Sequence, residues 1–177
     1  MSKIGKKNIL IPKDSSIKIE GEHLTISGPK GTKKLTINDK IFSSKLNESE
    51  FQLLPLEKKV DKKTSIMWGT YRSLINNAVL GVSTGHEKIL ELNGVGFRAN
   101  LKGEFLNLQI GFSHDVNFKI PKDIKIIVEK QTVIKINGVD KELVSKIAAD
   151  IKNLKPVEPY KGKGIKERGQ FVLRKEG

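Results

Sequence analysis

Short stretches in which apolar and polar residues alternate occur along the whole chain and predict β-strands. Two of them, residues 17–20 and 24–28, are separated by only a short polar stretch and predict a hairpin. Further strand patterns run through residues 35–54 and 89–110, with turn-forming residues between them. We therefore expect a chain rich in short antiparallel strands.

The first hairpin pattern occurs again in the second half of the chain, beginning with the same four residues. Ile-Pro-Lys-Asp at 11–14 recurs at 120–123, and apolar positions 17 and 19 match 126 and 128 at the same offset. One residue later in register, Leu-Thr-Ile-Ser-Gly at 24–28 matches Ile-Lys-Ile-Asn-Gly at 134–138. The shared tetrapeptide and the continued phase favour an internal duplication over chance resemblance of two hairpins.

A helix is predicted after each copy of the hairpin. Asp140 is a suitable N-cap for the second helix, whose apolar residues recur at helical spacing: Leu143, Ile147, Ile151 and Leu154. The first helix has the same spacing and a glycine stop signal at Gly81: Met67, Tyr71, Leu74, Ala78 and Val82. Trp68, the only tryptophan, lies one position off this apolar face, and we expect it to be partly buried.

These patterns predict an α+β protein of two duplicated small domains, each a mostly antiparallel β-sheet packed against one helix. The first domain is expected to span residues 1–82 and the second residues 83–177, because glycine, serine and threonine cluster at the boundary. The last part of the second domain, residues 155–177, is expected to be an extended basic tail.

Charge is the feature of the composition that says most about a partner. The 177 residues carry 33 basic and 20 acidic side chains, a formal net charge of +13, which indicates a polyanionic partner. Residues 152–177 concentrate this surplus, with eight basic and three acidic residues. The chain has no cysteine, so disulfides and thiolate metal sites are excluded, and it has no apolar run long enough to cross a membrane.

Three patterns that resemble catalytic or cofactor motifs lack the context that their chemistry requires. Gly-Val-Gly-Phe-Arg-Ala at 94–99 fits a loose dinucleotide motif, but a strand pattern follows where that motif requires a helix. Ser-His-Asp at 113–115 places triad-type residues side by side, whereas triads are assembled from distant segments, so we interpret it as a polar loop. The three histidines lack metal-ligand spacing. We expect no catalytic site, no metal, no cofactor and no small-molecule substrate.

The tail between Pro156 and Lys166 has the composition of a phosphate-binding segment. Two prolines and two glycines exclude a regular helix there, so the chain is expected to run extended along a surface. Lysines alternate with glycines in Lys161-Gly162-Lys163-Gly164, which allows close backbone approach and phosphate contacts. Tyr160 offers a ring for stacking on a base. The alternative, a solvated basic tail without a partner, is the less favoured interpretation.

Four segments together make the chain resemble the bacterial-type large-subunit ribosomal protein six family from end to end. The most specific is Glu-Pro-Tyr-Lys-Gly-Lys-Gly-Ile at 158–165, and the others are Ser-Lys-Ile-Gly-Lys-Lys at 2–7, Gly-Pro-Lys-Gly at 28–31, and Trp-Gly-Thr-Tyr-Arg-Ser-Leu at 68–74 with the segment 94–99. Val157 departs from the family pattern, which usually has a proline there.

This resemblance implies two duplicated α+β domains and binding to large-subunit rRNA near the sarcin–ricin loop and the stalk base, next to other ribosomal proteins. The ribosome would be that of a bacterial cytoplasm or of an organelle such as the mitochondrion. The residues expected to contact rRNA lie in the tail and just before it: Lys152, Lys155, Tyr160, Lys161, Gly162, Lys163, Gly164, Lys166, Arg168, Arg174 and Lys175. Secondary contacts are expected elsewhere, at Lys3, Lys6, Lys7, Lys30 and Arg98.

Two other functions remain open at this point. The charge alone suits equally well a free-standing RNA-binding regulator or an RNA chaperone that acts away from the ribosome. A dinucleotide enzyme that uses residues 94–99 is the third and weakest hypothesis.

Overall fold

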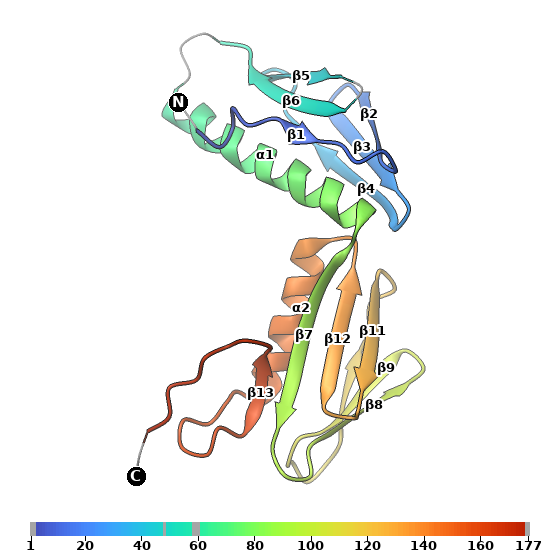
Figure 1. The fold of residues 1–177 in the computed structure, drawn as a ribbon, viewed down its shortest axis with the longest axis vertical. Helices are drawn as coiled ribbons and strands as arrows, with labels where there is room; N and C mark the ends of the chain where they lie inside the picture. The colour runs from blue at the N-terminus through green and yellow to red at the C-terminus, as the bar shows by residue number, and fades with distance from the viewer. Residues whose placement is uncertain (1–2, 48, 58–60, 176–177) are drawn as a thin grey trace. The chain divides into compact units, whose positions relative to one another are not determined.

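The computed structural model describes residues 3–47, 49–57 and 61–175, and the chain divides into two compact units, Met1–Gly85 and His86–Gly177 (Figure 1). Within the described residues, each unit contains one α-helix and two small sheets, in which all strand pairs are antiparallel. The predicted α+β class and the duplicated architecture are confirmed. The prediction of one sheet in each unit was wrong, because three strands of each unit pair only with one another and form a second sheet, separate from the one that contains the repeated hairpin.

The first unit places two three-stranded sheets against one long helix, α1. One sheet has the strand order β2-β3-β4 and the other β1-β6-β5. Buried apolar side chains from both sheets, including Leu24, Ile26 and Phe51, form the core with Ile75 and Val79 of α1. The elements are β1 (Ile9–Leu10), β2 (Ser16–Glu20), β3 (His23–Gly28), β4 (Gly31–Thr36), β5 (Phe42–Leu46), β6 (Glu50–Pro55) and α1 (Lys62–Ser83).

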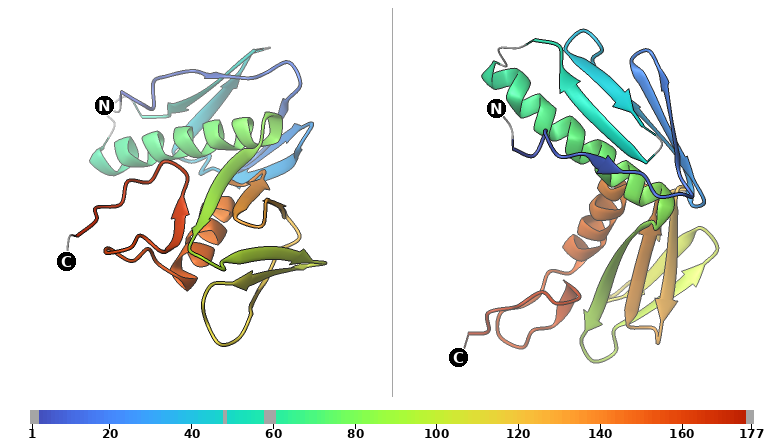
Figure 2. Two further views of the ribbon diagram at one scale, coloured as in Figure 1. Left: turned by 60° about the horizontal axis from the view of Figure 1, so that its bottom comes forward. Right: turned by 45° about the horizontal axis from the view of Figure 1, so that its top comes forward.

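The second unit has a four-stranded sheet, β11-β12-β7-β13, and a three-stranded sheet, β10-β9-β8. Helix α2 packs against β7, β12 and β13 (Figures 1 and 2). Ala148 and Ile151 of this helix are fully buried in the core. The elements are β7 (His86–Asn93), β8 (Arg98–Lys102), β9 (Phe105–Gln109), β10 (Val116–Lys119), β11 (Ile124–Glu129), β12 (Val133–Gly138), α2 (Lys141–Leu154) and β13 (Gly164–Glu167).

The repeated sequence pattern corresponds to the hairpins β2–β3 and β11–β12. The apolar pair Ile17↔Ile26 in the first is equivalent to Ile126↔Ile136 in the second. The turn of the second hairpin is one residue longer and contains two positive-φ residues, which accounts for the one-residue shift between the two matches.

The glycine that ends each hairpin makes room for the helix of its own unit. A Cβ on Gly28 would lie 2.6 Å from the carbonyl oxygen of Val82 in α1, and one on Gly138 would lie 2.8 Å from Cγ2 of Val144 in α2. A larger residue at Gly28 would press on the backbone of α1, and one at Gly138 would press on the side chains of Val144 and of Ile124, whose Cδ1 would be 2.7 Å away. This equivalence supports the duplication at the level of packing.

Both helices begin at an aspartate cap. Asp140 accepts a hydrogen bond from the Glu142 N–H, as predicted, and Asp61 accepts one from the Lys62 N–H. Trp68 is only 3% exposed, and its Nε1–H donates to the carbonyl oxygen of Leu53 at 2.7 Å. The expectation of partial burial was therefore wrong.

Candidate nucleic-acid interface

The tail does not run freely from the end of α2 but returns to the sheet as β13, which was not predicted. Strand β13 lies beside β7 (Figures 1 and 2). The two strands pair in the register Ile165↔Leu92, and the side chain of Ile165 is fully buried. The Ile165 N–H donates to the carbonyl oxygen of Lys155 at 2.9 Å, so the strand is also tied to the end of the helix. The segment between Lys155 and Gly164 is consequently a loop fixed at both ends.

Gly164 closes this loop through close contact with the chain itself. Its φ is +142°, a backbone conformation that side-chain-bearing residues rarely adopt, and a Cβ here would lie 2.6 Å from the Pro156 oxygen and the Val157 Cα. Gly164 is also buried. The close approach that its missing side chain permits is therefore to the neighbouring backbone of the same loop.

Backbone hydrogen bonds organise the tip of the loop. The Glu158 N–H donates to the Lys163 oxygen at 2.8 Å, and the Gly162 N–H donates to the Glu158 oxygen at 3.1 Å. Between these bonds, Lys161 and Lys163 are exposed, and Tyr160 is 56% exposed. The structure thus places two ammonium groups and a phenol ring on one short, internally bonded turn.

The end of the tail lies along this turn. The Lys175 N–H donates to the Pro159 oxygen at 3.0 Å, and a Cβ on Gly162 would lie 3.3 Å from the guanidinium of Arg174. The structure therefore brings Arg174 and Lys175 together with the loop. Phe171 and Leu173, which are 86% and 74% exposed, are apolar residues of the tail that the sequence reasoning missed.

Three of the predicted basic residues are engaged with carboxylates on and beside β13. Lys152 lies 3.6 Å from Glu167, while Lys166 and Arg168 lie 3.5 Å and 3.9 Å from Glu91. Figure 1 shows the strands concerned, β7 and β13, side by side. The positive charge of these residues is thus partly offset within the protein.

Lys88, which the sequence reasoning also missed, forms the shortest contact of this network. Its Nζ donates to Glu167 Oε2 at 2.8 Å. This hydrogen bond lowers the pKa of the Glu167 carboxyl below its ordinary value of 4.5, with a further contribution from Lys152, although partial burial acts in the opposite direction. Glu167 therefore stays ionised to lower pH than a free carboxylate. No local pattern in the sequence pointed to this pairing.

The basic N-terminal segment is held against α1 in the first unit. Gly5 lies so close to the indole of Trp68 that a Cβ would be 2.5 Å from the ring, and the Arg72 guanidinium donates to the backbone oxygens of Lys7 and Asn8 at 3.4 and 3.3 Å. The segment presents three exposed lysines: Lys3, Lys6 and Lys7.

Lys30 and Arg98, the other two residues expected to make secondary RNA contacts, lie on separate elements. Lys30 is exposed at the turn between β3 and β4, where its N–H donates to the Val82 oxygen at 3.0 Å. Arg98 is exposed at the start of β8, in the sheet that does not contain β13. Lys30 thus belongs to the first unit, whereas Arg98 belongs to the second unit but to a different sheet from β13.

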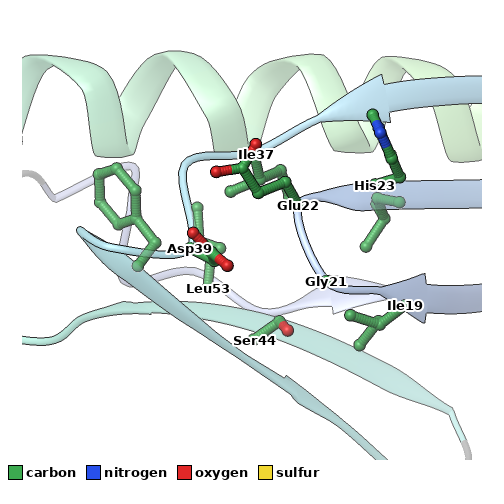
Figure 3. Close-up of a pocket in the computed structure, with 10 residues that line it drawn as sticks. Ile19, Gly21, Glu22, His23, Ile37, Asp39, Ser44 and Leu53 are labelled. Atoms are coloured by element: carbon green, nitrogen blue, oxygen red, sulfur yellow. The ribbon is translucent and has the colours of Figure 1, made fainter.

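Sites for small ligands find little support in the described residues. The hollow in Figure 3, between the two sheets of the first unit, has a volume of about 30 Å³ and is lined by residues such as Gly21, Ile37 and Leu53. That is room for about one water molecule, whereas ligand pockets usually measure about 300–1,000 Å³. A depression beside α1, of about 580 Å³ and lined by residues such as Ile4, Gly69 and Leu74, is too open to enclose a small ligand. Among the described residues, no group of three or more acidic, histidine or cysteine side chains could hold a metal ion, and no helix is long and apolar enough to cross a membrane.

The dinucleotide hypothesis is contradicted by the element that follows its motif. Phe97 is buried, and residues 98–102 form strand β8, so no helix N-terminus faces the Gly-Val-Gly turn. The motif instead makes a glycine bend between two strands, with positive φ at Gly94 and Gly96.

Comparison with known proteins gives one consistent result over the full chain. The family profile described as "Ribosomal protein L6" matches residues 11–85 and 93–168, one copy in each unit. Proteins named "Large ribosomal subunit protein uL6" from Staphylococcus epidermidis and Beijerinckia indica are each 45% identical over 177 residues, and one from Phenylobacterium zucineum is 44% identical. Each alignment covers 100% of this chain and 98% of the relative.

Proposed function

Because this chain belongs to the ribosomal protein L6 family, we propose that it binds large-subunit rRNA through the loop and tail that β13 anchors to the second unit. The family makes it a structural constituent of the large ribosomal subunit and not an enzyme. Its partners are accordingly rRNA and other ribosomal proteins.

The observation that carries the proposal is the fixed presentation of cations at the tip of the loop. Lys161 and Lys163 are exposed on a turn closed by its own backbone hydrogen bonds, and Arg174 lies against Gly162 in the same turn. A basic group held in place loses less conformational entropy on binding a phosphate than one on a free tail. Lysine charges gain affinity by releasing counterions from the RNA, and Tyr160 adds a ring for stacking.

The remaining tail residues contribute less electrostatically in this proposal. Lys152 pairs with Glu167 of β13, and Lys166 and Arg168 pair with Glu91 of β7. A phosphate must therefore compete with these two carboxylates for the three basic side chains. Their main effect is to hold β13 in place. None of these groups reads a base edge in a fixed pattern, so the proposed binding depends on RNA shape and backbone.

A second set of phosphate contacts is proposed, in the first unit except for Arg98 of the second unit. Lys3, Lys6 and Lys7 lie on a segment ordered by Gly5 and Arg72, which gives them a defined position. Lys30 and Arg98 are exposed on other elements and complete the proposed secondary set.

The location proposed within the subunit is the neighbourhood of the sarcin–ricin loop and the stalk base, next to the ribosomal proteins there. This follows from the family resemblance of the segment 158–165. Hydroxyl-radical footprinting of the protein on isolated large-subunit rRNA domains tests it. Protection confined to the domain that carries the sarcin–ricin loop supports this location, and protection of other domains alone refutes it.

The binding itself is tested by titrating the purified protein onto that rRNA domain at several salt concentrations. With about six to ten phosphate contacts, affinity should fall about 10³–10⁵-fold between about 50 and 200 mM salt. An affinity that does not respond to salt would show that phosphate contacts do not drive binding.

A further inference from the structure

The loop between β9 and β10 carries an exposed aromatic cluster that the tail does not account for. The rings of Phe112 and His114 are nearly parallel, with an interplanar angle of 16° and centroids 6.2 Å apart. Phe112 is 46% exposed, and His114 is also exposed. A phenyl ring so exposed is not serving the hydrophobic core.

A cation from the end of α2 joins this cluster. Lys155 Nζ lies 4.8 Å from the centroid of the Phe112 ring, within the distance of a cation–π interaction. The backbone oxygen of the same Lys155 accepts the hydrogen bond from Ile165 in β13. The aromatic cluster therefore lies at the base of the loop that carries Lys161 and Lys163.

The loop that carries the two rings is held in a defined conformation. Asp115 Oδ2 accepts hydrogen bonds from Asn107 Nδ2 at 3.3 Å and from Gln109 Nε2 at 3.4 Å, so its carboxylate is engaged with β9. At the other end of the loop, Gly111 has φ +80°, and a Cβ there would lie 3.3 Å from the ring of Phe97. The rings are thus positioned before any partner arrives, which lowers the entropic cost of binding a flat ligand.

We propose that Phe112 and His114 form a stacking site for one unpaired base of the RNA whose backbone the tail binds, with Lys155 positioned to neutralise a phosphate of that nucleotide. This inference rests on the proposed rRNA binding. Exposed aromatic rings next to basic groups are the usual means by which proteins hold unstacked bases, because every base has a flat π-face. An apolar protein segment would fit less well, because the cluster combines its rings with an ammonium and a polar loop.

The salt dependence of binding separates this site from the lysines of the tail. Stacking releases no counterions, so Phe112→Ala should weaken binding about 5- to 150-fold while leaving the slope of log affinity against log salt unchanged. Phe105→Ala is the matched control, because Phe105 is 44% exposed at the opposite end of β9. It should leave both the affinity and the slope unchanged.

Two substitutions at His114 distinguish the loss of a stacking ring from a loss of folding. His114→Ala should weaken binding, and His114→Phe should restore it, because the flat ring and not the imidazole chemistry is required. Melting temperatures of all variants are measured alongside the titrations with the rRNA domain.

The outcomes distinguish the two proposals. If the wild-type protein binds with the expected salt dependence but Phe112→Ala binds equally well, the stacking site is refuted and the tail proposal stands. If His114→Ala weakens binding and His114→Phe does not restore it, this result also counts against stacking. If the wild-type affinity does not respond to salt, the proposed rRNA binding itself fails.

Discussion

Ile165→Ala tests whether β13 anchors the loop that we propose binds RNA. Ile165 is fully buried and faces the core of the second unit, among Leu92, Ile147 and Ile151. Replacing a buried isoleucine by alanine costs about 2–5 kcal/mol, because burial is lost and a cavity remains. β13 has only four residues and lies at the edge of its sheet, so this loss should fall mainly on the local detachment of the strand.

Amide hydrogen exchange measures that detachment directly. The Ile165 N–H bonds to the Lys155 oxygen and the Arg168 N–H to the Ile89 oxygen, so both amides exchange when β13 leaves the sheet. A loss of about 2 kcal/mol or more should lower their protection about thirtyfold or more. The apparent affinity for rRNA should scale with the fraction of molecules in which β13 is attached, so it falls only as far as that fraction falls.

Ile127→Ala is the control, because Ile127 is 38% exposed on β11 of the same sheet. Its effect on stability should stay within about 0.5 kcal/mol, as for other exposed positions. The reasoning is refuted if Ile165→Ala leaves the protection of both amides unchanged, or if Ile127→Ala lowers it equally.

Three further predictions concern the charges and the N-terminal segment. Lys161→Ala combined with Lys163→Ala should weaken rRNA binding and reduce the salt slope by about two without lowering the melting temperature, since both side chains are exposed; an unchanged slope in filter binding would contradict this. The lowered pKa of Glu167 means that its ion pairs stabilise the fold above the ordinary value of 4.5, and that this stability is lost as pH falls through the folded-state pKa. Glu167→Gln should therefore flatten the acid side of a plot of melting temperature against pH, and an unaltered plot would argue against the pairing. Gly5→Ala should displace the N-terminal segment from Trp68 and shift its fluorescence to longer wavelength, because the added Cβ would lie 2.5 Å from the indole; an unchanged spectrum would contradict this.

Local sequence patterns predicted the elements whose formation depends on local physics. The alternating apolar residues of the two hairpins appear as buried positions in β3 and β12, and Asp140 caps α2 as expected. The equivalent glycines at 28 and 138 explain why the hairpins could be matched in sequence. The exposure of Lys161 and Lys163 could be predicted because lysine side chains are seldom fully buried and the glycines between them offer no side chain to cover them.

The features that were missed depend on partners far away in the chain. Residues 164–167 contain one apolar side chain among glycine and charged residues, and they become a strand only because β7 offers an edge some seventy residues earlier in the sequence. Trp68 is buried because Gly5 and Leu53 cover it, which its position beside the apolar helix face did not indicate. The ion pairs of Glu91 and the approach of Lys155 to Phe112 likewise join distant segments.

The central claim, that the loop presented by β13 attaches this protein to rRNA, is tested most directly by competition during assembly of the large subunit. Truncation after Leu154 would also remove Ile165 from the core, so charge reversal is the cleaner perturbation. Equal amounts of wild-type protein and the double variant Lys161→Glu, Lys163→Glu are offered to assembling subunits, and their incorporation is counted by mass spectrometry. A second competition uses Lys122→Glu with Lys125→Glu, exposed lysines of the same unit, as a control of equal net charge. We predict that the loop variant is depleted from assembled subunits while the control enters normally; equal incorporation of the loop variant and the wild type would contradict the claim.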